Sequence, residues 1–349
     1  MNVLVSISHP AHVHLFKNLI WELQKQNDDI LVIAKEKDVT LALLDLYHIP
    51  YQIFTKKSNM KIFESITRVI RFLKILHEYH PDVVISQMDP TLAFSAKLAG
   101  VRCLCLANSD LVNSKSIRLF TALTLPFVDK VYTPEVFKMD FGKKHIKYKG
   151  YKESAYLHPN RFTPDKSVLQ ELNIHEGEYY TVLRLVAWKA YHDVGEHGLT
   201  NIIDLIKILE KYSRVLITME GELPAELAKY QITLAPTKMH DILYYASLLV
   251  TDSQTMAVEA AMLGTPVIRC NSFVGVNDMS NFQELEDKYG LLYNISNESD
   301  LMKKVEELLR LPNLKLEWKE KREILLADKI DLTDFLLQEI NSIVGNKNE

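Results

Sequence analysis

Short apolar, β-branched runs alternate with longer amphipathic segments from the first residue onward. Such alternation is typical of βαβ units, which build a parallel sheet through right-handed crossovers. In the first half we expect strands at residues 2–7, 30–34, 51–54, 82–87, 102–107 and 129–133, and helices centred near residues 20, 43, 70, 96, 119 and 137. This half is therefore predicted to be one doubly wound α/β domain.

The alternation restarts at residues 179–187, after a stretch that contains Gly150, Pro159 and Pro164. Further strands are expected at residues 213–219, 231–235, 247–252, 265–270 and 291–295. A chain of 349 residues exceeds the size at which one core usually stops growing. We therefore predict two doubly wound domains, 1–150 and 151–325, and a helix at 326–349 that packs back on the first domain.

Bulk composition restricts the partners and the compartment. The formal charge of −4 gives no general attraction to nucleic acid. The three cysteines, Cys103, Cys105 and Cys270, are too few for a disulfide framework and lack further ligands at metal-site spacing. The first residues read as a strand rather than a signal peptide, and no apolar run reaches the roughly 18 residues of a membrane span. We expect a cytoplasmic protein without a metal or nucleic-acid site.

The segment Thr251–Glu259 lies at a predicted strand-to-helix turn. Residues 248–252 read as a buried strand, and residues 253–263 read as a helix that Gly264 stops. In open α/β sheets, ligands bind beyond the carboxyl ends of the strands, where helix N-termini attract phosphate. Ser253, Gln254 and Thr255 are therefore candidates to bind a diphosphate.

Glu259 follows Ser253 by six residues on the same predicted helix. A carboxylate at this distance can accept hydrogen bonds from a ribose diol while the diphosphate occupies the helix start. The alternative is that Asp252 or Ser253 only caps the helix and that Glu259 is solvated or ion-paired.

The sequence of residues 251–268, TDSQTMAVEAAMLGTPVI, resembles the UDP-binding segment of UDP-sugar 2-epimerases and GT-B glycosyltransferases. The opening residues 8–17 and the stretch Arg184–Asp193 are similar to an uncharacterised microbial family allied to those enzymes. The resemblance implies two Rossmann-like domains that face a cleft, and a UDP-type ligand bound without a metal or cofactor. Where the epimerases have two glycines this chain has Gln254 and Thr255, so side-chain contacts are expected to replace close backbone approach.

Other residues of the second half are candidates for the same ligand. Arg184 lies within an apolar strand, and Lys189 follows on the next loop, where a pyrophosphate needs counter-charge. A structural carboxylate is the alternative partner of Arg184. Related transferases hold the base through backbone groups near the position of Met239.

In the first half, His9, His12 and His14 follow the first strand. We select His12 for acid/base chemistry or acceptor contact, since histidine titrates near neutral pH; capping or packing of the first helix is the alternative. Asp110 follows another strand of this half and is selected to orient an acceptor hydroxyl, ahead of Asp89. Turn formation is the alternative for both aspartates.

Residues 56–74 combine basic and apolar side chains at helical spacing. This pattern suits peripheral contact with an anionic membrane at the inner face, and exposure of Phe72 and Tyr79 would favour that interpretation. The alternative is a solvated helix whose apolar side lies in the core.

Three classes of function follow. The first is a glycosyltransferase that moves a sugar from a UDP-type donor to a glycan or lipid-linked acceptor in polysaccharide or glycoconjugate biosynthesis. The second is a UDP-N-acetylsugar 2-epimerase, and the third is a non-catalytic module that binds nucleotide sugars.

Overall fold

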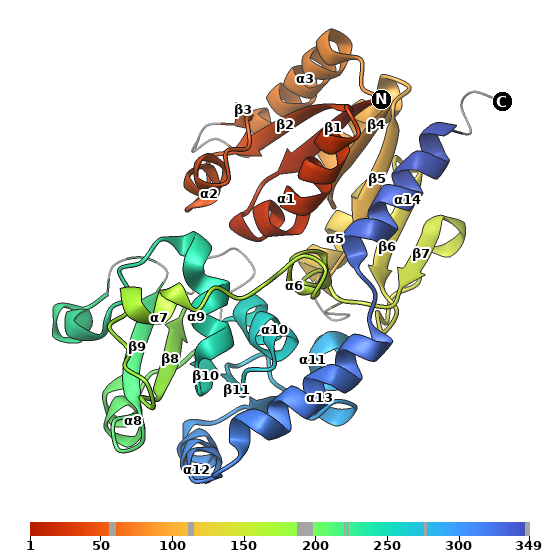
Figure 1. The fold of residues 1–349 in the computed structure, drawn as a ribbon. Helices are drawn as coiled ribbons and strands as arrows, with labels where there is room; N and C mark the ends of the chain where they lie inside the picture. Colours follow the sequence, from red (N-terminus) through yellow and green to blue (C-terminus); the bar gives the residue numbers. More distant parts are fainter. Residues whose placement is uncertain are drawn as a thin grey trace. The chain divides into compact units, whose positions relative to one another are not determined.

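The computed structural model describes residues 1–55, 61–110, 115–186, 198–219, 221, 223–275 and 278–345. The chain forms two compact units, each built on its own parallel sheet (Figure 1). Unit 1 comprises Met1–Arg161 and Lys329–Glu349, and unit 2 comprises Phe162–Asp328. The sequence placed the breaks after residues 150 and 325, whereas the two units divide after Arg161 and after Asp328.

Unit 1 contains a seven-stranded parallel sheet in the order β3-β2-β1-β4-β5-β6-β7. The strands are β1 (Asn2–Ile7), β2 (Asp29–Lys35), β3 (Gln52–Thr55), β4 (Val83–Gln87), β5 (Arg102–Leu106), β6 (Lys130–Pro134) and β7 (His145–Tyr148). The order runs outward from β1 in both directions. The chain therefore reverses its direction of travel between β1 and β4, and the carboxyl ends of these two strands flank the switch point of the sheet.

Right-handed crossovers in opposite directions place helices on opposite faces of the sheet of unit 1. One face carries α1 (Pro10–Lys25), α2 (Thr40–Leu46) and the C-terminal α14 (Leu332–Gly345), with the short α6 (Ser154–Leu157) against α1 and α14. The other face carries α3 (Lys61–Tyr79), α4 (Pro90–Leu98) and α5 (Lys115–Thr124), packed in that order (Figure 1). Phe72 of α3 is buried and Tyr79 donates a hydrogen bond to the Asp29 carbonyl, so neither is the exposed aromatic that would favour membrane contact.

One helix of unit 1 was predicted wrongly and one strand was missed. The segment near residue 137 is not helical, because the N–H of Phe137 closes a single turn on Pro134 and its ring enters the core. The chain then passes through η1 (Gly142–Lys144) into β7, which pairs with β6 at the edge of the sheet. The four residues of β7 alternate weakly and include His145 and Lys147, so this strand carries little sequence signal.

Unit 2 contains a five-stranded parallel sheet in the order β12-β11-β10-β8-β9. The strands are β8 (Tyr180–Leu185), β9 (Arg214–Met219), β10 (Leu248–Thr251), β11 (Val267–Cys270) and β12 (Leu292–Ile295). The helices are α7 (Ser167–Glu171), α8 (Ile202–Leu209), η3 (Ala225–Tyr230), η4 (Pro236–Lys238), α9 (Met239–Tyr245), α10 (Gln254–Leu263), α11 (Ser280–Asp287), α12 (Glu298–Leu309) and α13 (Leu314–Asp328). In this sheet the switch point lies between β8 and β10.

The strand predicted at residues 231–235 is wrong. Gln231 forms an isolated bridge to Ile217, and the N–H of Ile232 donates to the Ile217 carbonyl. Pairing stops there because the segment is held between η3 and η4, and Pro236 begins η4. Most residues on both faces of the remaining strands are apolar, as expected for strands between two helix layers.

The C-terminal segment closes unit 1 through both apolar and ionic contacts. Leu336 and Ile340 of α14 are fully buried where α14 packs against α1 and α6. Arg161 donates to Glu22, Asp331 and Asp334, and thereby ties the start of this segment to α1. In the described part of the chain, no helix has the length and apolar character needed to span a bilayer.

Replacing Ile340 with alanine should lower the free energy of unfolding of unit 1 by ~2–5 kcal/mol, because it opens a cavity under α14. Hydrogen exchange of the slowest amides in β1 reports this quantity for unit 1 alone. Ser342→Ala, at an exposed position of the same helix, should change it by less than ~0.5 kcal/mol. Equal effects of the two substitutions would show that α14 is not part of the core of unit 1.

Candidate functional site

The candidate site in unit 2 is centred on the start of α10, at the carboxyl end of β10. Ser253 is the N-cap: its Oγ accepts a hydrogen bond from the Met256 N–H at 3.4 Å. Gly264 ends the helix at φ +73°, a left-handed conformation that favours glycine. The bounds of β10 and α10 thus agree closely with those expected from the sequence. Ser253 caps the helix, which was the alternative to phosphate binding for this residue.

Hydrogen bonds from both neighbouring strands hold this turn in place. The Asp252 carboxylate accepts from the Val186 N–H at 2.9 Å, just beyond β8. The Asp252 carbonyl accepts from the Asn271 side chain at 3.0 Å, just beyond β11. Thr251 Oγ1 donates to the Arg184 carbonyl at 3.1 Å and accepts from the Ser253 N–H at 2.8 Å. The start of α10 is therefore fixed at the switch point of the second sheet.

Gln254 and Thr255 occupy the first turn of α10 and are partly exposed. Backbone N–H groups in the first turn of a helix have no intrahelical acceptor and carry the positive end of the helix dipole. Together with the Ser253 hydroxyl, this turn can bind a phosphate oxygen. The position of a diphosphate at this point was predicted from the sequence and stays a prediction.

Glu259 lies farther along α10 and is almost completely buried, with an exposed fraction of 5%. Its Oε1 lies 3.1 Å from Nε2 of His240, which is equally buried on α9. The ring of Phe162 lies edge-on to that imidazole, with the centroids 6.3 Å apart. Glu259 thus has a buried side-chain partner in His240, and any contact with a ribose diol must be made alongside this contact.

The other candidates of unit 2, Met239, Arg184 and Lys189, lie in different parts of the chain. Met239 begins α9, next to His240, and is partly exposed. Arg184, on β8, donates to Thr218 Oγ1 of the neighbouring β9 at 3.1 Å. Lys189 lies outside the residues that the structure describes.

In unit 1, His12 lies in the first turn of α1, directly after β1. Its Nδ1 accepts from the Ser8 N–H at 3.3 Å, and because a backbone N–H only donates, a neutral ring must carry its proton on Nε2. Burial lowers the pKa of His12 well below its ordinary value, and repulsion from His9, Lys152 and Lys37 adds to this effect. The ring is therefore neutral at physiological pH, and its proton is on Nε2.

The two neighbouring histidines have structural contacts. His9 is the N-cap of α1 and accepts from the Ala11 N–H at 3.2 Å. His14 lies 3.4 Å from the Tyr47 hydroxyl through Nδ1 and packs against the Tyr156 ring. These contacts match the capping and packing roles that were the alternative for part of this histidine cluster.

Both aspartates of unit 1 lie at the carboxyl edge of the first sheet and both make structural hydrogen bonds. The Asp110 carboxylate is buried and accepts from the Lys138 N–H at 3.0 Å. Asp89 caps α4 by accepting from the N–H groups of Thr91 and Leu92, and it pairs with Arg68 at 2.5 Å. Because β1, β4 and β5 are neighbours, the topology brings His12 and both aspartates to one edge of the sheet.

Sequence reasoning missed a buried ion pair in the core of unit 2. Arg269 is fully buried on β11, ion-paired with Asp278 and stacked on Phe282 at 3.5 Å from the ring centroid. Burial lowers the pKa of its guanidinium. A charge between two apolar residues of a predicted strand was the available signal. Asp278 is therefore the partner of a guanidinium in the core.

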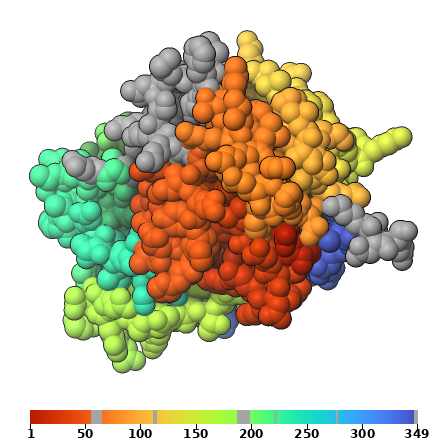
Figure 2. Space-filling view, turned by 90° about the horizontal axis from the view of Figure 1, so that it is seen from above, coloured from red at the N-terminus to blue at the C-terminus, as the bar shows by residue number. Residues whose placement is uncertain are grey.

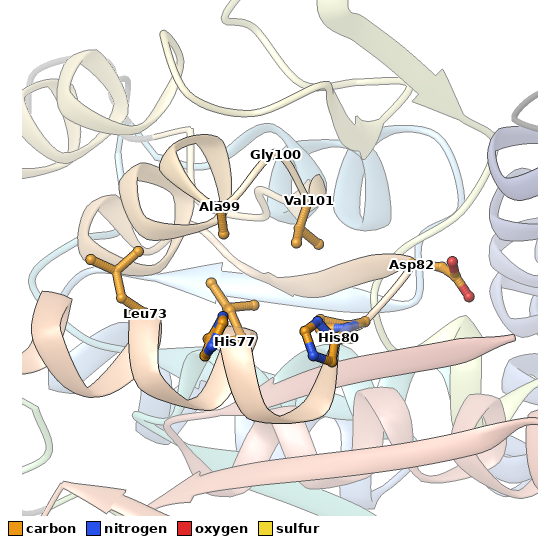
Figure 3. A pocket seen from close by; sticks show the side chains of 9 residues that line it. Leu73, His77, His80, Asp82, Ala99, Gly100 and Val101 are labelled. Atoms are coloured by element: carbon orange, nitrogen blue, oxygen red, sulfur yellow. The ribbon is translucent and has the colours of Figure 1, made fainter.

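A pocket of about 530 Å³ in unit 1 lies apart from all these candidate residues (Figure 3). His77 and His80 line it from the end of α3, and Asp82, Gly100 and Val101 line it just before β4 and β5. It therefore opens at the amino edge of the first sheet, opposite the edge that carries His12. Among the described residues, no group of three or more acidic, histidine or cysteine side chains is arranged to hold a metal ion.

Two parallel sheets, each with helices on both faces, define an α/β protein of GT-B-like architecture. The fold is similar to UDP-GlcNAc 2-epimerase from Neisseria meningitidis bound to UDP-GlcNAc, with a TM-score of 0.70, 14% identity and coverage of 98% of this chain and 100% of that chain. It is also similar to the glycosyltransferase VinC in complex with dTDP, with a TM-score of 0.65, 10% identity and coverage of 99% and 100%. The predicted fold class is confirmed.

The chain belongs to the family described as "Protein of unknown function (DUF354)", whose profile matches residues 1–340. An uncharacterized protein of Methanocaldococcus jannaschii, MJ0665, is 22% identical over 292 residues, which cover 77% of this chain and 82% of the relative. The predicted membership of an uncharacterised family allied to the epimerases and GT-B transferases is thereby confirmed.

At pH 6 the His12 ring should be neutral with its proton on Nε2, whereas an unperturbed histidine, with a pKa of about 6.5, would be mostly charged. Long-range ¹H–¹⁵N NMR of the imidazoles measures both properties, and loss of the signal in His12→Asn assigns it. Because the folded pKa is depressed, the unfolded chain takes up the proton first, and the stability of unit 1 should fall as the pH drops below about 6.5. A charged ring, or a proton on Nδ1, would contradict this account.

Proposed function

We propose that the chain is a GT-B-type glycosyltransferase. It moves a sugar from a UDP-type nucleotide sugar, bound by unit 2, to a glycan or lipid-linked acceptor, bound by unit 1. The acceptor class places the reaction in polysaccharide or glycoconjugate biosynthesis. If the acceptor is lipid-linked, the proposal includes contact of residues 56–74 with the membrane.

One observation carries the donor side of the proposal. The first turn of α10 lies at the carboxyl ends of β8 and β10, where the strand order reverses, and this is the position at which open α/β sheets bind ligands. Hydrogen bonds through Asp252 hold the turn before any ligand arrives, so binding requires little local ordering. The turn offers hydrogen-bond donors and a positive dipole to a diphosphate.

In the proposed reaction, residues of unit 2 act on the leaving group and residues of unit 1 act on the acceptor. The acceptor hydroxyl attacks the anomeric carbon, the bond from that carbon to the diphosphate oxygen breaks, and UDP leaves with the electron pair. The start of α10 stabilises the charge that develops on the leaving diphosphate. The acceptor proton passes to a base, for which His12 and Asp110 are the candidates.

The contacts of those two candidates limit how they can act. Nδ1 of His12 accepts from Ser8 and the carboxylate of Asp110 accepts from Lys138. Nε2 of His12 carries the proton in this state, so it first serves as a donor to the acceptor substrate or to a phosphate oxygen. His12 becomes a base only after its proton moves to Nδ1 and the bond from Ser8 breaks.

A UDP-N-acetylsugar 2-epimerase is the second candidate. It is favoured by the full-length fold similarity to the Neisseria meningitidis enzyme. An epimerase inverts one carbon of its substrate and needs no acceptor. Proton NMR of UDP-N-acetylglucosamine incubated with the protein separates the two functions, because only epimerisation yields the manno isomer without an acceptor.

Incubation with UDP-sugars and acceptor fractions should release UDP, and omission of the acceptor should reduce the release at least tenfold. A coupled assay for UDP measures the rate. His12→Asn, which keeps an acceptor near the Ser8 N–H but removes the Nε2 proton, should lower kcat by roughly 10²–10⁴-fold. The transferase assignment is wrong if no UDP-sugar yields UDP with any acceptor fraction.

Glu259→Gln should weaken binding of UDP roughly 10- to 100-fold, because it replaces a charged acceptor of the ribose hydroxyls by a neutral one. Glutamine keeps the shape of the side chain and an oxygen near His240, so the fold should persist. Titration calorimetry measures the affinity, with Glu317→Gln at an exposed position of α13 as the matched control. Equal affinities for the wild type and Glu259→Gln would remove Glu259 from the site.

A further inference from the structure

The outer surfaces of α3 and α5 expose five large apolar side chains, called here the α3–α5 apolar surface. Its residues and their exposed fractions are Ile66 (61%), Ile70 (62%), Leu119 (59%), Phe120 (54%) and Leu123 (50%). Single exposed apolar residues are normal on a folded protein, but these form two groups on two helices of one layer. Ile66 and Ile70 are four residues apart. Leu119, Phe120 and Leu123 lie within an arc of about 100° around the axis of α5, so each set shares one face of its helix.

The core of unit 1 already uses a different side of α3. Phe72 and Leu76 point into the core and are almost fully buried. Phe72 is about 200° from Ile70 around the helix axis, since each residue advances about 100°. Ile66 and Ile70 therefore form a second apolar stripe that no core contact explains.

The two parts of this surface lie on the same face of unit 1. α3 packs against α4 and α4 packs against α5, so the three helices form one layer on the sheet. Figure 2 shows the orange segment that contains α3 at the surface, with the lighter orange segment of α4 beside it. Both α3 and α5 begin at the carboxyl edge of the sheet, and Ile66 and Leu119 are each in the second turn. The apolar side chains therefore lie at similar heights in the layer.

The same three helices are strongly basic within an acidic chain. Neither α4 nor α5 contains Asp or Glu, whereas the chain as a whole carries −4. Two of the basic side chains of α3 face acidic partners, Arg68 with Asp89 and Lys74 with Glu78. Among the residues of this layer whose side chains the structure describes, six are basic and one is acidic: Arg68, Arg71, Lys74, Lys97, Lys115 and Arg118, against Glu78.

We propose that the α3–α5 apolar surface docks on an anionic lipid bilayer, with the apolar side chains at the headgroup boundary and the exposed Lys115 and Arg118 against lipid phosphates. Exposed apolar residues flanked by Lys and Arg are the combination that such a surface binds. A two-fold contact with a second copy would bring Arg118 and Lys115 of both copies together, and like charges oppose that arrangement. The remainder of the chain is more negative than −4, so repulsion from the bilayer orients this face toward it.

Sedimentation of the full chain with lipid vesicles tests this proposal without reference to catalysis. The chain should sediment with vesicles of phosphatidylcholine and phosphatidylglycerol, and much less with phosphatidylcholine alone. Ile70→Glu and Phe120→Glu should each weaken binding on the order of tenfold, because a carboxylate would enter the headgroup boundary. Arg118→Gln should weaken it by a smaller factor, and raised salt should weaken it further.

Ile324→Glu is the matched control, since Ile324 is 65% exposed on α13 of unit 2. It should bind vesicles as well as the wild type, and circular dichroism should show all variants folded. The proposal is overturned if the wild type does not sediment with anionic vesicles, or if Ile70→Glu and Phe120→Glu bind like Ile324→Glu. It is also overturned if Phe120→Glu dissociates a dimer that Ile324→Glu leaves intact, because the surface then contacts a second copy.

Discussion

The two hydrogen bonds made by Asp252 determine the geometry of the candidate site. Its carboxylate accepts from the end of β8 and its carbonyl accepts from the loop after β11, so one residue joins the carboxyl ends of three adjacent strands. Asp252 is buried, and hydrogen bonds to a buried carboxylate are among the stronger ones in proteins. The helix that follows consequently starts at a fixed point of the switch region.

The pair of Glu259 and His240 adds a second constraint on α10. Burial of a carboxylate is costly unless it is hydrogen-bonded, and His240 supplies a partner at 3.1 Å from a different helix. The pair links α9 to α10 and leaves Glu259 oriented by an imidazole. In the proposed site, the carboxylate that contacts His240 also binds the ribose hydroxyls. Its position on α10 fixes the distance between the ribose and the diphosphate at the start of the helix.

The fold could be predicted from the sequence because local patterns specify most of it. The strands around Val5, Ile85 and Leu249 are continuous apolar runs, and the helix ends at Ser253 and Gly264 follow from capping chemistry. The missed strand β7 forms because it pairs with β6, and its own composition gives little signal. The segment near residue 231 is not a strand, because its pairing with β9 stops after a single bridge. Such pairings between distant residues leave little local signal.

The site was harder to predict for the same reason. Capping and helix position could place Ser253, but the partner of Glu259 is nineteen residues away on another helix. The tautomer of His12 depends on one backbone N–H of the preceding turn, and burial decides its charge. Residue type therefore identified candidates, whereas contacts determined which of them cap, pack or pair.

Hydrogen exchange with and without UDP tests the central claim, that a nucleotide binds at the start of α10. The account predicts slower exchange on addition of UDP for the amides of Gln254 and Thr255, in the first turn of α10, because their N–H groups donate to phosphate. The amides of α13, on the same unit, serve as the internal reference and should not change. Binding of UDP that protects other segments and leaves the amides of Gln254 and Thr255 unchanged would contradict the account.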